Sequence, residues 1–200
     1  MADITASMVK ELRDKSGAGM MDCKKALAAT GGDMDKAIDE LRKKGLAAAQ
    51  KKSSRTTREG AIDSYVHAGG KIGVLVEVGV ETDFVARSDP FKEFTHDLAM
   101  QVAASSPRWV RRDEVPADVV EREKAIYREQ AKGKPDKVVE QMLVGKLNKF
   151  FQEVCLMEQP FVKDPDRTIE QLRTDLVGVI GENVDVRRFV RFQLGETSED

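Results

Sequence analysis

The sequence predicts an α+β fold in which helices cover a small antiparallel sheet. Three observations predict it: the first 45 residues carry apolar side chains at helical spacing, residues 61–80 alternate with a period of two, and residues 184–194 alternate again. A period of two indicates strands, whereas i, i+3, i+4 spacing indicates helices.

Length and composition set the class of protein. The chain has 200 residues, of which 40% are apolar and 34% charged, and its formal net charge is −2. These values exclude bulk disorder, a collagen-like chain and a disulfide scaffold. A protein that coats nucleic acid is usually strongly basic, and this chain is not.

Cysteines and histidines are too few for a metal cluster. Cys23 and Cys155 are far apart in the sequence, and His67 and His96 are the only histidines. We therefore expect no metal and no cofactor. The N-terminus is charged from Asp3 onward, so no secretory signal is expected, and no stretch approaches the ~18 apolar residues of a membrane span. The expected protein is soluble and cytoplasmic, with no membrane contact.

The first 45 residues predict a module of three short helices. Asp3 is expected to cap the first helix and Asp33 the third, because an aspartate side chain accepts a hydrogen bond from a free N–H at a helix start. Glycines interrupt the pattern within SGAGM and again at the GG pair. Gly45 is expected to end the third helix. So small a module is marginal alone and suits a docking role.

A basic segment follows the module, and residues 46–60 are expected to form a basic helix and linker. Seven basic residues and no acidic residue lie between Arg42 and Arg58. A solvated helix followed by a linker explains this pattern. Contact with nucleic acid, or with an acidic surface of a protein partner, is compatible with it as well.

The predicted α+β core covers residues 61–195 and begins with a β-hairpin. Residues 61–67 and 71–80 are its strands, and Gly69-Gly70 is its turn. Asp89-Pro90 then opens a helix. An antiparallel helical hairpin is expected at about 116–153, with GKP as its turn.

The C-terminal part of the core is predicted to contain one helix and one strand. Thr168 and Gln171 form a capping box for the helix, which Gly181 closes. In the strand, alternation places five apolar residues on one face: Val184, Val186, Val190, Phe192 and Leu194. Residues 196–200 form an acidic tail.

Catalytic motifs are absent from the sequence. It contains no GxxxxGK[ST], no GxGxxG after a strand and no GxSxG, and Cys23 has no histidine near it in the sequence. We expect a protein that acts by binding another macromolecule and is not an enzyme.

One connecting segment, Thr82-Asp83-Phe84-Val85, has the composition of a binding loop. It follows a strand and precedes the helix that Asp89-Pro90 opens. An aromatic residue beside an acid on such a loop can act as a binding hot spot. The alternative is that Phe84 packs into the core below the loop.

Three motifs resemble the elongation factor Ts family: VKELRDKSGAGMMDCKKAL, ETDFVAR and GENVDVRRFVRF. The resemblance extends over nearly the whole chain. It implies a guanine-nucleotide exchange factor for elongation factor Tu that itself binds no nucleotide. The three-helix module resembles the ubiquitin-associated-like domain of the family, which implies that Lys10, Arg13 and Met20 dock on the partner.

The same resemblance assigns the central segment. It implies that Thr82, Asp83, Phe84 and Val85 enter the partner near its Mg²⁺ site, with Asp83 and Phe84 as the intruding side chains, and that the helical hairpin is a projecting coiled coil. Larger members carry two core subdomains where this chain has room for one, and similar short members form homodimers. Two competing functions are a nucleic-acid-binding protein that uses residues 42–58 and an adaptor that uses the three-helix module alone.

Overall fold

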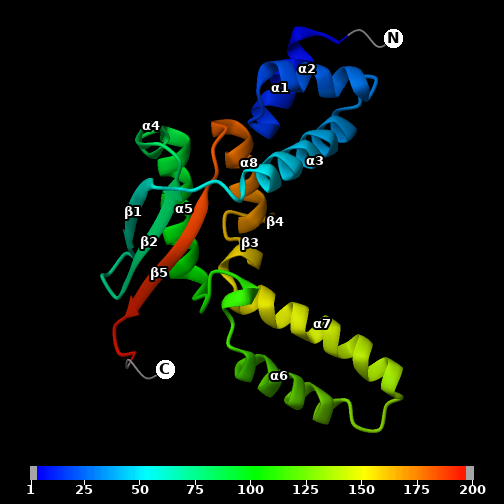
Figure 1. Cartoon of the computed structure of the whole chain (residues 1–200), viewed down its shortest axis with the longest axis vertical. Coiled ribbons are helices and arrows are strands. Elements are labelled where there is room, and N and C mark those ends of the chain that lie inside the picture. Colours follow the sequence, from blue (N-terminus) through cyan, green and yellow to red (C-terminus); the bar gives the residue numbers. More distant parts are fainter. Residues whose placement is uncertain (1–3, 197–200) are drawn as a thin grey trace. The chain divides into compact units, whose positions relative to one another are not determined.

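The computed structural model describes residues 4–196 and has the α+β fold that the sequence predicts (Figure 1). The predicted cap Asp3 and residues 197–200 of the acidic tail lie outside this range. The chain divides into two compact units. Unit 1 comprises Met1–Ile62, Val78–Thr95 and Gln171–Val186, and unit 2 comprises Asp63–Glu77, His96–Glu170 and Arg187–Asp200.

Unit 1 begins with the three predicted helices, α1 (Ala6–Ser16), α2 (Met20–Ala29) and α3 (Met34–Lys52). Asp33 caps α3 as expected, because its Oδ1 accepts a hydrogen bond from the N–H of Lys36 at 3.1 Å. Thr5 caps α1. The core of this three-helix module consists of the buried residues Val9, Leu12, Cys23, Ala26, Leu27 and Ala37.

The third helix is longer than the sequence predicted. Gly45 does not end it, and α3 continues to Lys52, into the predicted basic helix and linker of residues 46–60. Leu46, Ala47, Ala48 and Ala49 follow directly and are strong helix formers, which offsets the cost of one glycine, about 1 kcal/mol. A Cβ at Gly45 would lie 3.7 Å from the Thr174 side chain, so the glycine faces a packed neighbour.

The sheet contains β1 (Glu59–Val66), β2 (Ile72–Val80) and β5 (Asp185–Gln193) in the order β1-β2-β5. The N–H of Leu194 donates to the carbonyl of Lys71 at 2.8 Å, so β5 ends where β2 begins and runs antiparallel to it. At the start of β1, Gly60 has φ +148°, and a Cβ there would lie 2.2 Å from the Val78 carbonyl oxygen. Only glycine fits that position.

The apolar residues predicted to share one face of β5 differ in burial along the strand. Val184 and Val186 are buried, but Val190, Phe192 and Leu194 are exposed. Arg187 and Arg188 are consecutive, yet both bind the Glu77 carboxylate, at 3.0 and 2.7 Å. The buried part of the strand therefore ends before this arginine pair.

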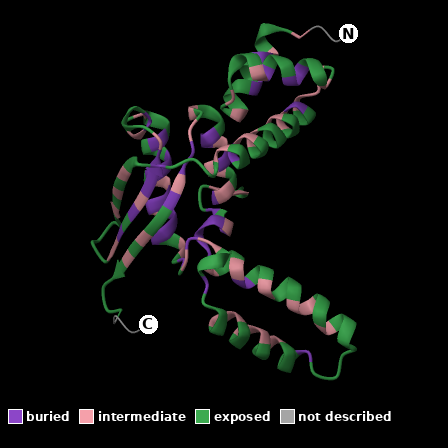
Figure 2. Ribbon diagram, in the orientation of Figure 1, coloured by how far each residue is buried: buried purple, intermediate pink, exposed green. Residues whose placement is uncertain are grey.

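Helix α5 (Asp89–Ser105) starts at the predicted Asp89-Pro90, and buried residues gather along it and along β2 (Figure 2). Within unit 2, the His96 ring meets the Tyr65 ring edge-on at 5.9 Å, and His96 Nδ1 lies 3.9 Å from the Asp63 carboxylate. This part of α5 therefore lies on the side of β1 to which Asp63 and Tyr65 point. Val66 is on the opposite, exposed face.

The rest of unit 2 includes the predicted helical hairpin, α6 (Ala117–Gln130) and α7 (Asp136–Val154), which pack on each other. The short 3₁₀ helices η1 (Arg112–Glu114) and η2 (Leu156–Glu158) lie at its base. Arg112 joins them: its guanidinium pairs with the Glu158 carboxylate and lies 4.7 Å from the centre of the Phe151 ring.

Sequence analysis did not predict a second, two-stranded sheet, β3 (Pro160–Phe161) with β4 (Asp164–Thr168). The buried side chain of Gln101 holds it, because its Nε2 donates to the Pro160 carbonyl at 3.2 Å and its Oε1 accepts from the Val162 N–H at 2.9 Å. Helix α8 (Ile169–Ile180) follows and ends before Gly181, as predicted.

Candidate functional site

The segment predicted as a loop is a four-residue helix, α4 (Asp83–Ala86). Thr82 caps it, because its Oγ1 accepts a hydrogen bond from the N–H of Val85 at 3.4 Å. The hydroxyl of Ser88 donates to the Val85 carbonyl at 2.7 Å and closes the other end. A helix this short has almost no stability of its own, so its neighbours must hold its conformation.

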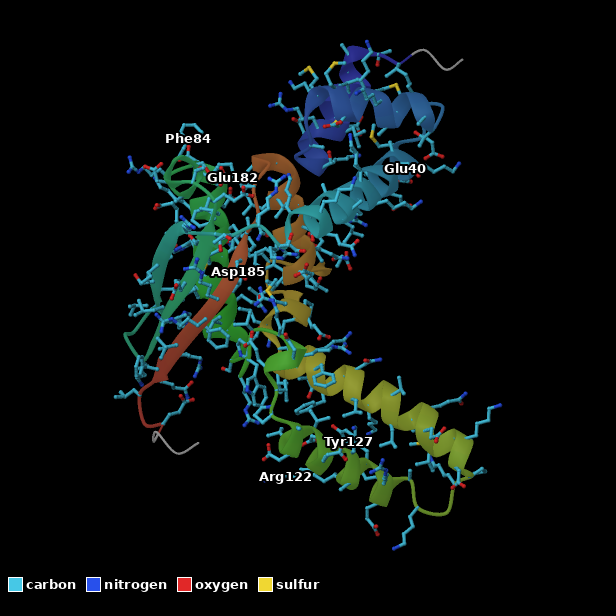
Figure 3. The ribbon with its side chains drawn as sticks, viewed as in Figure 1. Glu40, Phe84, Arg122, Tyr127, Glu182 and Asp185 are labelled. Atoms are coloured by element: carbon cyan, nitrogen blue, oxygen red, sulfur yellow. The ribbon has the colours of Figure 1, made fainter. Side chains whose placement is uncertain are left out.

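Phe84 projects from α4 into solvent (Figure 3). Its relative exposure is 81%, against 7% for the adjacent Val85. The alternative that Phe84 packs into the core below the segment is therefore wrong, and Val85 is the residue of this turn that is buried. An isolated large aromatic residue, so exposed on an anchored turn, is available to a partner.

Asp83 also lies on the exposed side of the turn. Its carboxylate pairs with the guanidinium of Arg87 at 3.0 Å, and both side chains are largely in water. An exposed pair of this kind contributes little to stability, about 0–1 kcal/mol. It can be broken at small cost when another cation or a polar surface approaches Asp83.

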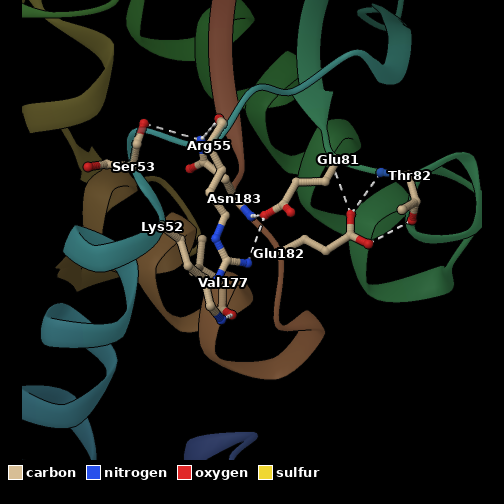
Figure 4. Close-up of polar contacts among 8 residues, drawn as sticks. All are labelled: Lys52, Ser53, Arg55, Glu81, Thr82, Val177, Glu182 and Asn183. Atoms are coloured by element: carbon tan, nitrogen blue, oxygen red, sulfur yellow. Dashed lines mark hydrogen bonds and ion pairs between the residues drawn. The ribbon is translucent and has the colours of Figure 1, made fainter.

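Glu182, which lies between α8 and β5, holds the base of this turn (Figure 4). Its Oε2 accepts hydrogen bonds from the backbone N–H groups of Glu81 at 3.1 Å and Thr82 at 3.0 Å. Its Oε1 accepts from the Thr82 hydroxyl at 2.7 Å. Gly181, with φ +77°, turns the chain sharply after α8 and so delivers Glu182 to this position.

A second set of bonds runs in the opposite direction between the same two segments. The Glu81 carboxylate accepts from the backbone N–H of Asn183 at 2.7 Å and lies 3.4 Å from the Arg55 guanidinium. The Asn183 amide in turn donates to the carbonyls of Ser53 at 3.4 Å and Arg55 at 3.0 Å. One polar cluster thus fixes the α4 turn and the end of the segment that leaves α3.

The residues predicted for docking lie on the three-helix module. Lys10 and Arg13 are exposed and one helical turn apart on α1, and Met20, the first residue of α2, has a relative exposure of 54%. The structure thus presents an exposed methionine and two cations on this module. They are separate from the cluster around Glu182.

Comparison with known proteins agrees with the motifs. The family model described as "Elongation factor TS" matches residues 7–196. The chain belongs to the elongation factor Ts family. It is 59% identical over 201 residues to Elongation factor Ts of Desulforamulus reducens, with 100% of this chain and 93% of that protein covered. It is 60% identical over 198 residues to Elongation factor Ts of Geobacter sulfurreducens, with 98% and 92% covered.

The match to the elongation factor Ts family includes every residue of the two sites described above. Sequence reasoning singled out the α4 residues and, from the family resemblance, predicted the docking residues, but it assigned no role to Glu182. The sequence pattern that could have indicated a role for Glu182 is the GENV motif, in which a glutamate follows a glycine that ends a helix. Its partner segment lies 100 positions away, and local patterns do not report contacts at that distance.

Some basic residues of the segment from Arg42 to Arg58 form contacts within the chain. Lys43 pairs with Glu40 and Lys44 with Asp22. The Lys52 ammonium donates to the Val177 carbonyl at 3.4 Å, and Arg55 pairs with Glu81. Four of the seven basic residues therefore bind other groups of the chain. Fewer cations are then available to bind phosphates than on a free cationic surface.

Among residues 4–196, no helix is both long enough and apolar enough to cross a membrane. Within the same range, no group of three histidine, cysteine or acidic side chains is placed to hold a metal ion. Cys23 and Cys155 are free and buried. Burial raises the pKa of the Cys155 thiol to about 11, with the nearby Glu158 as a second cause, so it is a neutral thiol near pH 7.

Proposed function

We propose that this protein is a guanine-nucleotide exchange factor that binds elongation factor Tu carrying GDP and promotes release of the GDP. The observation that carries the proposal is the exposure of Phe84 on a turn whose base is fixed by Glu182. Family membership supplies the identity of the partner, because the relatives are named Elongation factor Ts. The proposed activity is binding, so the protein is not an enzyme in the strict sense.

In this proposal the three-helix module and the α4 turn have different roles. The three-helix module, likened to a ubiquitin-associated domain by its sequence, docks on the partner through Lys10, Arg13 and Met20. The turn from Thr82 to Val85 then enters near the Mg²⁺ that the partner holds with GDP. Asp83 and Phe84 are the side chains that disturb this site, while Thr82 and Val85 keep the turn in shape.

Thermodynamic linkage explains how binding alone releases a nucleotide. Suppose that the turn binds better to an arrangement of the partner that has lost its Mg²⁺ contacts. The turn then lowers the affinity of the partner for GDP, and GDP lowers the affinity of the partner for the turn by the same factor. Mg²⁺ is among the largest charges that neutralise the phosphates, so disturbing it weakens the hold on GDP. The exchange factor breaks no bond and needs no nucleotide or cofactor of its own. Its proposed place of work is the cytoplasm, where proteins are synthesised.

We also propose that the protein works as a homodimer joined through one face of its sheet. Five exposed apolar residues of unit 2 lie on the three strands or just beyond them: Val66, Leu75, Val190, Phe192 and Leu194. A sheet of three strands with an exposed apolar face gains stability by pairing with another such face. A second copy brings an identical surface, as a twofold interface requires.

The experiment is to mix elongation factor Tu, loaded with a fluorescent GDP, with this protein and excess unlabelled GDP in a stopped-flow instrument. The proposal expects release to accelerate with factor concentration up to a plateau. It also expects a smaller fold-acceleration when a chelator has already removed Mg²⁺, because the loss of Mg²⁺ contacts that the factor would cause has then already occurred. Release that is indifferent to the factor would overturn the proposal.

A further inference from the structure

We infer that Glu182 is a positioning residue for exchange: it holds the α4 turn in the geometry in which Phe84 and Asp83 engage the partner. The inference rests on the proposed function and names a residue to which that function assigns no role. It starts from three hydrogen bonds, all accepted by the Glu182 carboxylate from two consecutive residues, Glu81 and Thr82.

The first step concerns the backbone just before α4. Strand β2 ends at Val80, so the N–H groups of Glu81 and Thr82 have left the sheet and α4 has not begun. Hydrogen bonds to an ionised acceptor are about twice as strong as neutral ones. A single carboxylate that accepts from both N–H groups therefore fixes the direction in which the chain enters the turn.

The second step concerns the helix cap. The Thr82 hydroxyl has one hydrogen to donate, and it donates to Glu182 while its oxygen accepts from the Val85 N–H. Glu182 thereby orients the very group that caps α4. Without the carboxylate, the hydroxyl can rotate and the cap is held only by a long bond of 3.4 Å.

The third step concerns the other contacts of the turn. The Glu81 carboxylate accepts from the Asn183 N–H at 2.7 Å, one residue before the cap, and this bond does not involve Thr82. Val85 is buried beneath it and Ser88 closes its far end, but Thr82, Asp83 and Phe84 are all exposed. A turn freed at its base spends part of its time in other conformations. The effect on exchange is then reduced by the fraction of time in which the competent geometry is populated.

This role predicts a specific kinetic signature. Docking through the three-helix module does not use Glu182, so the factor concentration for half-maximal exchange should stay close to that of the unmodified protein. Entry of the turn takes place within the docked complex, so the plateau rate of GDP release should fall, by about tenfold for Glu182→Ala. Glu182→Gln keeps one acceptor oxygen and should retain an intermediate plateau.

The test is a double-mutant cycle between Glu182→Ala and Phe84→Ala, measured as plateau rates of fluorescent GDP release from elongation factor Tu. If Glu182 acts through the turn, adding Glu182→Ala to Phe84→Ala should cause little further loss. Glu129→Ala on the hairpin is the matched control, because it removes the same charge and one surface ion pair. Its plateau should be unchanged, and thermal melts of all variants should remain cooperative.

Two results would overturn the inference. One is a plateau for Glu182→Ala equal to that of the unmodified protein; the other is independent, multiplicative losses in the double mutant. If Glu182→Ala does not fold, the cycle is run with Glu182→Gln, and the same two results decide. Failure of the proposed function is recognisably different, because then even the unmodified protein would not accelerate release.

Discussion

Phe84 and Val85 are neighbours in one four-residue helix, yet the first has a relative exposure of 81% and the second of 7%. Two adjacent side chains of the turn therefore have different roles, one in attachment to the fold and one in contact with a partner. Val85 attaches the turn to the body of unit 1, and Phe84 remains free for a partner. The separation depends on the cap of Thr82, which fixes the helical phase of both residues.

Stability measurements should separate these two side chains. Val85→Ala removes buried methyl groups and is expected to lower the free energy of unfolding by about 2 kcal/mol. Phe84→Ala removes a side chain that is already in water, and should change it by less than about 0.5 kcal/mol. Urea unfolding followed by circular dichroism checks both values. A larger loss for Phe84→Ala than for Val85→Ala would mean that Phe84 packs against the fold.

Substitutions in the three-helix module should weaken docking without slowing the docked complex. Lys10→Glu combined with Arg13→Glu reverses two exposed cations on α1 and should raise the half-saturating concentration for exchange about tenfold. The plateau rate should stay the same, because the α4 turn is untouched. Lys132→Glu on the hairpin is the control with the same charge change per site. An unchanged half-saturating concentration for the double variant would remove Lys10 and Arg13 from the docking surface.

The homodimer is tested by a charge on the apolar sheet face. Analytical ultracentrifugation of the unmodified protein should give twice the chain mass of 22.2 kDa. Phe192→Glu should give the monomer, because a carboxylate buried against an apolar face is strongly unfavourable. Val144→Glu changes an apolar residue of similar exposure on α7 and should leave the dimer intact. A monomer for the unmodified protein at micromolar concentration would contradict the proposal.

The raised pKa of Cys155 predicts a loss of stability in alkali. The folded protein keeps the thiol protonated up to about pH 11, whereas the unfolded chain releases the proton near pH 9. The unfolded state therefore binds fewer protons between these values, and the free energy of unfolding should fall as the pH rises. Unfolding monitored by the fluorescence of Trp109, whose backbone pairs with that of Cys155, measures this between pH 9 and 11. Cys155→Ala should flatten the slope, and an unchanged slope would refute this assignment.

Local patterns in the sequence were enough to predict most of the elements. The cap at Asp33, the Asp89-Pro90 helix start and the alternation in β2 each concern residues within a few positions of one another, and all three were confirmed. The end of α3 was missed because three alanines outweigh Gly45. In β5, burial of the apolar residues ends at Val186, and a period-two pattern cannot show where along a strand the core ends.

For the candidate site too, local patterns predicted some features and missed those that depend on distant contacts. The sequence singled out Thr82 to Val85, because an aromatic residue and an acid between a strand and a helix form a local signal. It could not show which of Phe84 and Val85 would be buried, since a four-residue helix has no measurable periodicity. It also could not show that Glu182 meets Thr82, because that contact depends on how α8 returns the chain to the end of β2.

The most direct test of the exchange mechanism is the plateau rate of fluorescent GDP release from elongation factor Tu by Phe84→Ala, measured beside its thermal melt. A hot-spot aromatic contributes about 2 kcal/mol or more, so the plateau should fall on the order of thirtyfold while the melting temperature stays the same. Asp83→Ala should slow release as well. A normal plateau for both variants, with both proteins folded, would contradict the account.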